Sequence, residues 1–170
     1  MIEFRIKGPI PVPTYKKSGI RHFDKDQEKT FWETCKSALP DLPKLSGCYI
    51  FCMQTKSLKP WYVGKTSKGY QHECFKPHQL TKLNHFINDH GTPVIFFAYK
   101  KFKNKESKKT KSTILHLEKF LIQAAKTSNP ELRNFQGTKA LWNIRGSIHS
   151  EPIKGPKPDD LGRFQQMLRL

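Results

Sequence analysis

The stretch GCYIFCMQTKSLKPWYVGKTSKG, residues 47–69, contains two short apolar runs separated by a polar segment. Both runs are rich in β-branched and aromatic residues, and the segment QTKSLKP between them carries turn-forming residues. The pattern predicts an antiparallel hairpin. Each predicted strand also places a tyrosine close to a glycine, Tyr49 after Gly47 and Tyr62 before Gly64, and a glycine lets a backbone or a ligand approach closely.

Side chains alternate between the two faces of a strand, so Tyr49, Phe51 and Met53 share one face. Cys48 and every second residue after it in this strand share the other face. If CYIFCM pairs with WYVG, we expect Tyr49 and Tyr62 to converge on one face of the sheet. Paired tyrosines are common in protein cores, so this convergence alone fits plain packing as well as a functional site.

Hydrophobic periodicity predicts further elements on both sides of this hairpin. The opening IEFRIKG alternates apolar and charged residues, which predicts a strand stopped by Pro9, Pro11 and Pro13. The other predicted elements are a helix over 26–39, one or two helices over 71–90 interrupted at Pro77, a strand over 93–102, a helix over 113–130 and an amphipathic helix over 159–170.

The charge of the chain points to a polyanionic partner. The 170 residues include 31 Lys and Arg against 14 Asp and Glu, a formal charge of +17, and such a field attracts polyanions by steering and by counterion release. We expect the partner to be DNA, most simply double-stranded DNA. An anionic membrane surface is the competitor, but the lysines are not confined to one face of an amphipathic helix, and there is no terminal lipidation signal.

Lysines dominate the segment KKFKNKESKKTK, residues 100–111, which has no core-forming period and is expected to be a solvated loop. Its lysines either increase solubility alone or bind phosphate groups of a nucleic acid. The candidate DNA-binding residues are Lys65, Lys100, Lys101, Lys103, Lys105, Lys108, Lys109 and Lys111.

The N-terminus has no apolar signal region, and no run approaches the ~18 apolar residues that cross a bilayer, so we expect a cytoplasmic protein with reduced, semi-buried cysteines. Cys48 and Cys52, followed by His72 and Cys74, offer a sharper alternative, a zinc site. Residues four apart in a strand lie about 13 Å from each other at ~3.3 Å per residue, which is too far to share an ion bound at ~2.3 Å.

Glu118 is the one carboxylate expected on the apolar face of a helix. On a wheel of about 100° per residue, Ile114, Leu121, Ile122 and Ala125 all fall within about 60° of it. An unpaired buried carboxylate costs several kcal/mol, so Glu118 needs a cation, a cluster of hydrogen bonds or a metal ion. The alternatives at this point are a salt bridge to a lysine and a metal site.

GCYIF, followed by WYVGKTSKG, LEKFLIQ and NPELRN, resembles the GIY-YIG nuclease domain, with residues 47–49 in place of GIY and residues 62–64 in place of YIG. The similarity runs from about Gly47 to Asn134. It implies an α+β fold with a small three-stranded antiparallel sheet flanked by helices, and a nuclease core over residues 47–146. Residues 1–46 would then be an N-terminal extension of a strand and a helix, and residues 147–170 a C-terminal extension with a short helix.

The resemblance also implies metal-dependent hydrolysis of a phosphodiester bond in DNA. By that resemblance, Tyr49 acts near the attacking water, Tyr62 positions or activates it, Glu118 holds one Mg²⁺ or Mn²⁺ ion, and Asn134 supports the site. Such chemistry needs a base on one side of the phosphate and charge neutralisation on the other. One carboxylate, waters and phosphate oxygens suit the octahedral oxygen coordination of Mg²⁺.

The chain departs from the family pattern where an arginine is expected, about eight residues after the glycine of YIG. His72 stands there, and no arginine occurs between Tyr49 and Lys119. The cationic role therefore has four candidates, His72, Lys76, His78 and Lys65, each of which is alternatively an ordinary surface residue. Two functions follow: a DNA endonuclease, or a non-catalytic nucleic-acid-binding protein that retains the fold without the contribution of the arginine.

Overall fold

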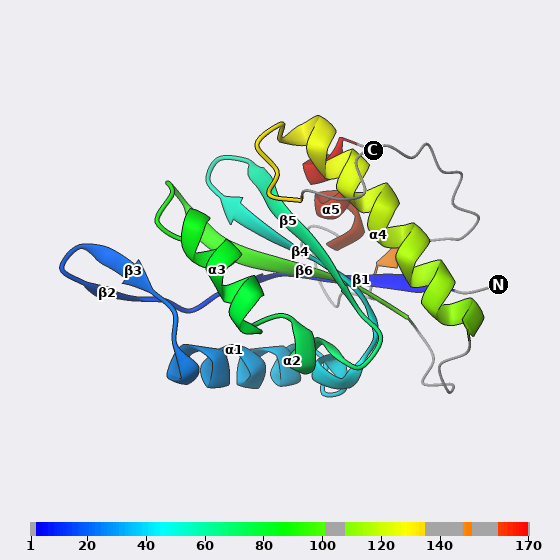
Figure 1. Ribbon diagram of the computed structural model, residues 1–170, viewed down its shortest axis with the longest axis horizontal. Helices are drawn as coiled ribbons and strands as arrows, with labels where there is room; N and C mark the ends of the chain where they lie inside the picture. The colour runs from blue at the N-terminus through cyan, green and yellow to red at the C-terminus, as the bar shows by residue number, and fades with distance from the viewer. Residues whose placement is uncertain (1–2, 101–107, 135–147, 151–159, 170) are drawn as a thin grey trace.

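A computed structural model of the chain describes residues 3–100, 108–134, 148–150 and 160–169. Its centre is a five-stranded sheet in the order β5-β4-β6-β1-β7 (Figure 1). Neighbouring strands are antiparallel except for β7, which runs parallel to β1. The strands are β1 (Phe4–Pro11), β4 (Gly47–Gln54), β5 (Leu58–Thr66), β6 (Thr92–Lys100) and β7 (Ile148–Ser150).

The predicted hairpin is β4 and β5, and the predicted third strand is β6, which pairs with β4 on the side away from β5. The expectation of a three-stranded sheet was wrong, because the N-terminal strand joins the same sheet next to β6. The prolines do not stop that strand at Pro9. A register shift between Lys7 and Ile10 takes Gly8 and Pro9 out of the ladder, so the missing N–H of Pro9 costs no hydrogen bond and pairing resumes at Ile10.

Helices cover both faces of the sheet. The predicted helices are α1 (Lys25–Ala38), α2 (Tyr70–Glu73), α3 (Pro77–Phe86), α4 (Lys108–Ser128) and α5 (Asp160–Leu168), with a short 3-10 turn at Leu42–Lys44. Residues 47–53 of β4 are all buried, as expected of a strand covered on both sides. The predicted helical breaks at Pro77 and after Ser128 are confirmed.

The side-chain alternation of β4 divides the interior into two clusters. Tyr49, Phe51 and Met53 pack with residues of α1, α2 and α3, whereas Cys48, Ile50 and Cys52 pack with residues of α4 and α5. The alternation predicted from CYIFCM is therefore confirmed, and it places the two tyrosine-bearing strands between two separate apolar layers.

The lysine-rich segment is not one continuous loop. Strand β6 extends to Lys100 and α4 begins at Lys108, while residues 101–107 lie outside the described part of the chain. The chain after α4 is described as far as residue 134. No helix in the described ranges combines the length and apolar character that a membrane span requires.

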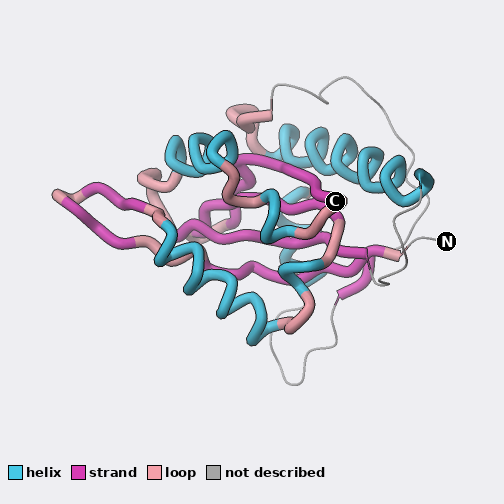
Figure 2. The backbone as a smooth tube through the Cα atoms, turned by 60° about the horizontal axis from the view of Figure 1, so that its bottom comes forward, coloured by secondary structure: helices cyan, strands magenta, loops and turns pink. Residues whose placement is uncertain are grey.

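A second, two-stranded sheet was not predicted. Strands β2 (Tyr15–Lys17) and β3 (Ile20–His22) form a short antiparallel hairpin that projects from one end of the molecule (Figure 2). We call residues 15–22 the arm. The alternation of YKKSGIRH is too short and too polar to stand out in the sequence.

Candidate functional site

A cleft of about 680 Å³ opens beside β5, at the edge of the main sheet. One wall comes from α2 and α3, the other from the N-terminal half of α4, and the floor from β5 and the turn that follows it. The cleft therefore collects residues from both faces of the sheet. Its ionisable and phenolic lining residues include Tyr62, Lys65, Glu73, Lys76, Lys111 and Glu118.

Tyr49 does not line this cleft. It lies opposite Gly64 in the ladder, is 0% exposed, and its ring covers Gly64 so closely that a Cβ at position 64 would overlap the phenol. Its hydroxyl has no hydrogen-bond partner within the described structure. The glycine of the second motif therefore makes room for the tyrosine of the first.

Gly47 plays the matching part for Tyr70. It has φ +152°, and a Cβ there would meet the carbonyl of Ala98 and the hydroxyl of Tyr70. That hydroxyl donates to Ala98 O at 2.9 Å and to Cys48 O at 3.2 Å. The two motif glycines thus allow close approach, as expected, but what approaches them is a tyrosine of the same chain.

Tyr62 lies at the wall of the cleft and is 7% exposed. Its hydroxyl accepts a hydrogen bond from Gln79 Nε2 at 3.2 Å, and Lys82 Nζ lies 4.0 Å from the centre of its ring. The ring centres of Tyr49 and Tyr62 are 6.3 Å apart, so the predicted convergence on one face is confirmed.

Burial raises the pKa of Tyr62, and the negative charges of Glu118 and Glu73 raise it further, while the bond from Gln79 opposes them. Burial also raises the pKa of Tyr49 well above its usual value. Burial lowers the pKa of Lys82, and Glu118 acts against that shift. Both phenols are therefore protonated at neutral pH, and both tyrosines lie within electrostatic reach of the two cleft carboxylates.

Glu118 projects from α4 toward β5. The helix face around it is apolar, with Ile114 and Leu121 buried, but the Glu118 side chain itself remains 14% exposed at the cleft. Its Oε2 pairs with Lys65 Nζ at 2.5 Å. The lysine salt bridge that the sequence left open is thus present in the structure, and metal binding by Glu118 stays a prediction.

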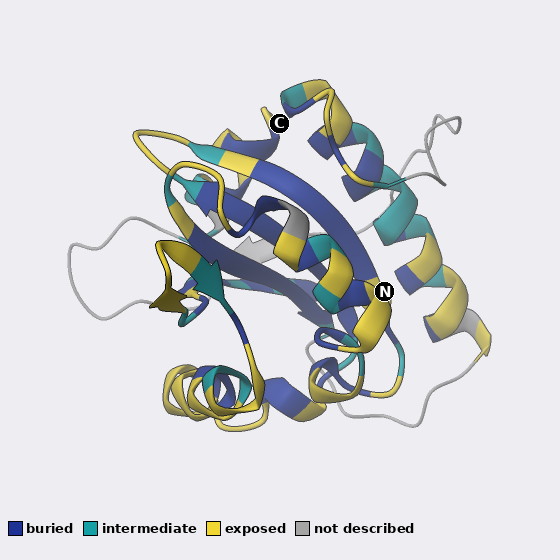
Figure 3. Cartoon of the chain, turned by 60° about the vertical axis from the view of Figure 1, so that its left-hand side comes forward, coloured by how far each residue is buried: buried dark blue, intermediate teal, exposed yellow. Residues whose placement is uncertain are grey.

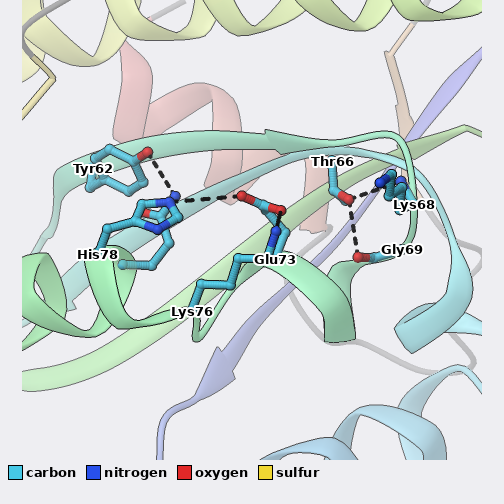
Figure 4. Close-up of polar contacts among 8 residues, drawn as sticks. Tyr62, Thr66, Lys68, Gly69, Glu73, Lys76 and His78 are labelled. Carbon is cyan, nitrogen blue, oxygen red and sulfur yellow. Dashed lines mark hydrogen bonds and ion pairs between the residues drawn. The ribbon is translucent and has the colours of Figure 1, made fainter.

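Glu73 is a second carboxylate in the cleft, which the sequence interpretation overlooked. Its side chain pairs with Lys76 Nζ at 2.7 Å and lies 3.8 Å from His78 Nε2, as Figure 4 shows. The sequence feature that could have identified Glu73 is its position on the short helix directly after the YVG strand. Of the four candidates for the cationic role, Lys65 and Lys76 line the cleft, His78 pairs with Glu73, and His72 is exposed outside the cleft lining.

Asn134 is bonded to the backbone of the second motif. Its Oδ1 accepts from Val63 N at 2.9 Å, and its Nδ2 donates to Val63 O at 2.7 Å. Two further bonds attach the same segment to β5, from Arg133 N to Trp61 O and from Asn129 Nδ2 to Pro60 O. Residues 129–134 therefore occupy the open edge of β5 in place of another strand.

The candidate DNA-binding lysines are divided by the structure. Lys65 and Lys111 line the cleft, together with Lys68, which was not predicted. Lys100 ends β6 with its Nζ 3.5 Å from Thr110 Oγ1, and the exposed Lys108 begins α4, whose first turn also contains Lys109. Lys101, Lys103 and Lys105 lie outside the described residues.

The donor set of the cleft fits a hard divalent cation better than zinc. Glu118 and Glu73 supply carboxylate oxygens, and Mg²⁺ is commonly bound by one or two carboxylates with waters and substrate phosphates completing its shell. Across the described chain no cluster of three or more His, Cys, Asp or Glu is placed to hold a metal ion. The four cysteines are free and buried, in agreement with the expectation of unpaired thiols.

When the chain is compared with models of protein families, with curated proteins and with solved structures, no match is found.

Proposed function

We propose that the protein is a metal-dependent DNA endonuclease that hydrolyses phosphodiester bonds in the cleft beside β5, at a site of the GIY-YIG type. The observation that carries the proposal is the cleft itself. It brings Tyr62 of the second motif together with Glu118, more than fifty residues away in sequence, and with Lys65, Lys76 and Lys111. An acidic group, a phenol and several cations in one opening are the parts that phosphodiester hydrolysis needs.

Each of these residues has a role that follows from its position at the cleft. The cleft lysines bind the phosphate backbone, and their cations offset the negative charge that grows on the phosphate as it is attacked. Tyr62, held by Gln79, orients the attacking water at the wall of the cleft. Asn134 holds the backbone directly after Tyr62 in place through its two bonds to Val63.

Glu118, with Glu73 beside it in the cleft, would hold the Mg²⁺ or Mn²⁺ ion, which when bound supplies Lewis acidity and a water of lowered pKa. Lys65 forms an ion pair with Glu118 in the free protein. When DNA binds, the Lys65 ammonium group can leave Glu118 and pair with a phosphate oxygen instead. Of the four candidates for the role of the missing arginine, Lys65 and Lys76 are the best placed, because both line the cleft.

A second function, nucleic-acid binding without cleavage, is favoured by two observations. Lys65 pairs with Glu118, the proposed metal ligand, and the hydroxyl of Tyr49 is buried behind Gly64 rather than directed into the cleft. A protein of this kind would retain the basic cleft and bind DNA there.

The deciding experiment measures cleavage of supercoiled plasmid with Mg²⁺, with Mn²⁺ and with EDTA, by wild type, Glu118→Gln and Glu131→Gln. Glu131 is the matched control, because it also pairs with a lysine, Lys59 Nζ at 2.8 Å, but outside the cleft lining. We expect metal-dependent nicking by wild type and Glu131→Gln, and a loss of about 100-fold or more in Glu118→Gln.

Thermal unfolding separates a chemical effect from a structural one. The Lys65 side chain is 42% exposed, so its pair with Glu118 contributes at most about 1 kcal/mol, and both variants should unfold near the wild-type temperature. Plasmid that stays intact with every metal, while the protein still binds DNA, would establish the binding function instead. Near-normal cleavage by Glu118→Gln would exclude the proposed role of that carboxylate.

A further inference from the structure

The arm, residues 15–22, is a two-stranded ribbon with a tight turn at its tip. Its ladder pairs Tyr15 with His22, Lys16 with Arg21 and Lys17 with Ile20, which leaves a two-residue loop of Ser18 and Gly19. Those two residues have φ values of 51° and 79°, the pattern of the type I′ turn that matches the natural twist of a hairpin. The tip is therefore well defined in spite of its small size.

Arg21 fixes the base of the arm to the loop between α3 and β6. The backbone N–H of Arg21 donates to Asn88 Oδ1 at 2.6 Å, and Asn88 Nδ2 donates back to Arg21 O at 3.2 Å. The guanidinium donates to the carbonyls of Ile87 and Gly91. Next to the arm, Phe23 packs on Phe75 with ring centres 4.6 Å apart. The ribbon is thus held at a set angle to the body.

One face of the arm carries two exposed large apolar side chains together with Lys17, which the ladder places opposite Ile20. The paired residues Tyr15 and His22 stack at 5.4 Å, and Ile20 lies beyond them toward the tip. Tyr15 is 39% and Ile20 54% exposed, and the only other large apolar side chain exposed to this degree in the described structure is Leu115, which lines the cleft. Figure 3 shows the arm in the colours of exposed and intermediate residues. These two side chains are therefore available for contact with a partner.

The positive charge of the arm indicates the kind of partner that it binds. YKKSGIRH contains Lys16, Lys17 and Arg21 and no acidic residue, within a protein of net charge +17. A second copy of this arm would bring like charges together, whereas a phosphate backbone would be attracted. A two-stranded β-ribbon also fits the major groove of B-DNA, which is about 12 Å wide.

We propose that the arm is a DNA-binding element that enters a groove of the duplex, with Lys16 and Lys17 on the phosphates and Ile20 against the base edges. This inference rests on DNA as the partner in the proposed function and adds a contact outside the cleft. An apolar side chain at a base edge is suited to contact a thymine methyl group, so the arm provides a source of sequence preference that the lysine-lined cleft lacks.

The first test measures binding to a 30-bp duplex in EDTA at several salt concentrations, where cleavage plays no part. Lys16→Ala with Lys17→Ala is compared with Lys29→Ala with Lys36→Ala, a control that removes the same charge from exposed lysines of α1. Loss of two phosphate contacts should reduce the slope of log K against log salt by about 1.8 for the arm variant. The α1 variant should retain the wild-type slope. Equal effects of the two pairs would overturn the proposal, because net charge alone would then explain both.

The second test separates groove entry from backbone contact. Ile20→Ser removes apolar surface without changing charge, so we expect weaker duplex binding with an unchanged salt slope and unchanged binding to the matched single strand. An equal loss on duplex and single strand, or conversion of a wild-type dimer to a monomer, would show that Ile20 serves another purpose and would refute groove entry. Unfolding temperatures confirm that each surface variant is folded.

Parallel plasmid cleavage keeps this inference apart from the nuclease proposal. Wild-type cleavage with no effect of any arm variant on binding would refute the arm alone. Binding that depends on the arm without cleavage under any metal would refute the nuclease and leave the arm in place.

Discussion

At the scale of single residues, the two motif tyrosines have different surroundings although their rings converge. Tyr62 reaches the cleft and has a hydrogen-bond partner in Gln79. Tyr49 is enclosed, and its hydroxyl has no partner in the described structure. A buried hydroxyl without a partner carries a desolvation cost of about 1–3 kcal/mol. The fold therefore bears a cost at Tyr49 that packing alone does not require.

Tyr49→Phe should leave the free energy of unfolding equal to or above that of wild type, because it removes the unpaired hydroxyl and keeps the ring over Gly64. Tyr70→Phe is the matched control: it removes a buried hydroxyl that donates to Ala98 O at 2.9 Å, and it should cost about 0.5–1.5 kcal/mol. Urea unfolding measures both. If Tyr49 acts in catalysis, cleavage by Tyr49→Phe falls while stability does not. An equal loss of stability in the two variants would show that the Tyr49 hydroxyl is bonded after all.

At the scale of elements, β5 carries the second motif at an edge of the sheet, and residues 129–134 cover that edge. An uncovered edge strand presents unpaired N–H and C=O groups to other chains. Here the side-chain amide of Asn134 bonds both the N–H and the C=O of Val63, as a neighbouring strand would. The segment after α4 thus both protects β5 and holds the backbone between Tyr62 and Gly64.

Asn134→Ala should remove both bonds, lower stability by about 1–3 kcal/mol and speed hydrogen exchange at the Val63 amide. Arg133→Ala is the control, since the backbone N–H of Arg133 still donates to Trp61 O at 2.9 Å after the side chain is removed. Exchange followed by NMR or mass spectrometry locates the effect. Unchanged exchange at Val63 in Asn134→Ala would mean that this edge is protected by other groups.

At the scale of the whole molecule, the sheet separates two apolar clusters, and each contains two of the four cysteines. Cys35 and Cys74 lie in the cluster under α1, α2 and α3, and Cys48 and Cys52 in the cluster under α4 and α5. Burial raises the pKa of the Cys35 thiol to about 12, and burial raises the pKa of the other three well above the usual value. The folded protein therefore keeps all four thiols protonated where the unfolded chain ionises them.

Stability should consequently fall as pH rises above about 8.5, the pKa of an unfolded thiol, because the unfolded state then binds fewer protons than the folded state. At pH 9.5, still below the midpoints at which lysine and tyrosine titrate, the loss should be about 1 kcal/mol per thiol. Urea unfolding under reducing conditions at pH 7.5, 8.5 and 9.5 measures it, and Cys35→Ala should show a shallower decline. Constant stability over this range would contradict burial of the thiols.

The sequence by itself determined those elements that depend on local pattern. Short apolar runs rich in β-branched and aromatic residues, with turn-forming residues between them, predicted the β4–β5 hairpin. Apolar spacing predicted the helices, with Pro77 at a break, because periodicity and proline chemistry act within a few residues. The approach of Tyr49 and Tyr62 followed from the alternation of side chains along a strand. Tyr49 shares its face of β4 with Phe51, and Tyr62 lies opposite Phe51 in the ladder.

Only the tertiary structure decided how these elements meet. The strand before and after Pro9 joined the main sheet, because pairing with β6 satisfies its backbone over most of its length and a register shift excludes Gly8 and Pro9. Glu118 belongs to a helix on one face of the sheet and Glu73 to a helix on the other, and they share a cleft because that cleft opens beside β5, the edge strand at which the sheet between the two faces ends. The position of Tyr49 behind Gly64 was likewise decided by packing. The ring of Tyr49 fills the space that the missing Cβ of Gly64 leaves, and the spacing of residues along the chain does not predict which side chain fills such a space.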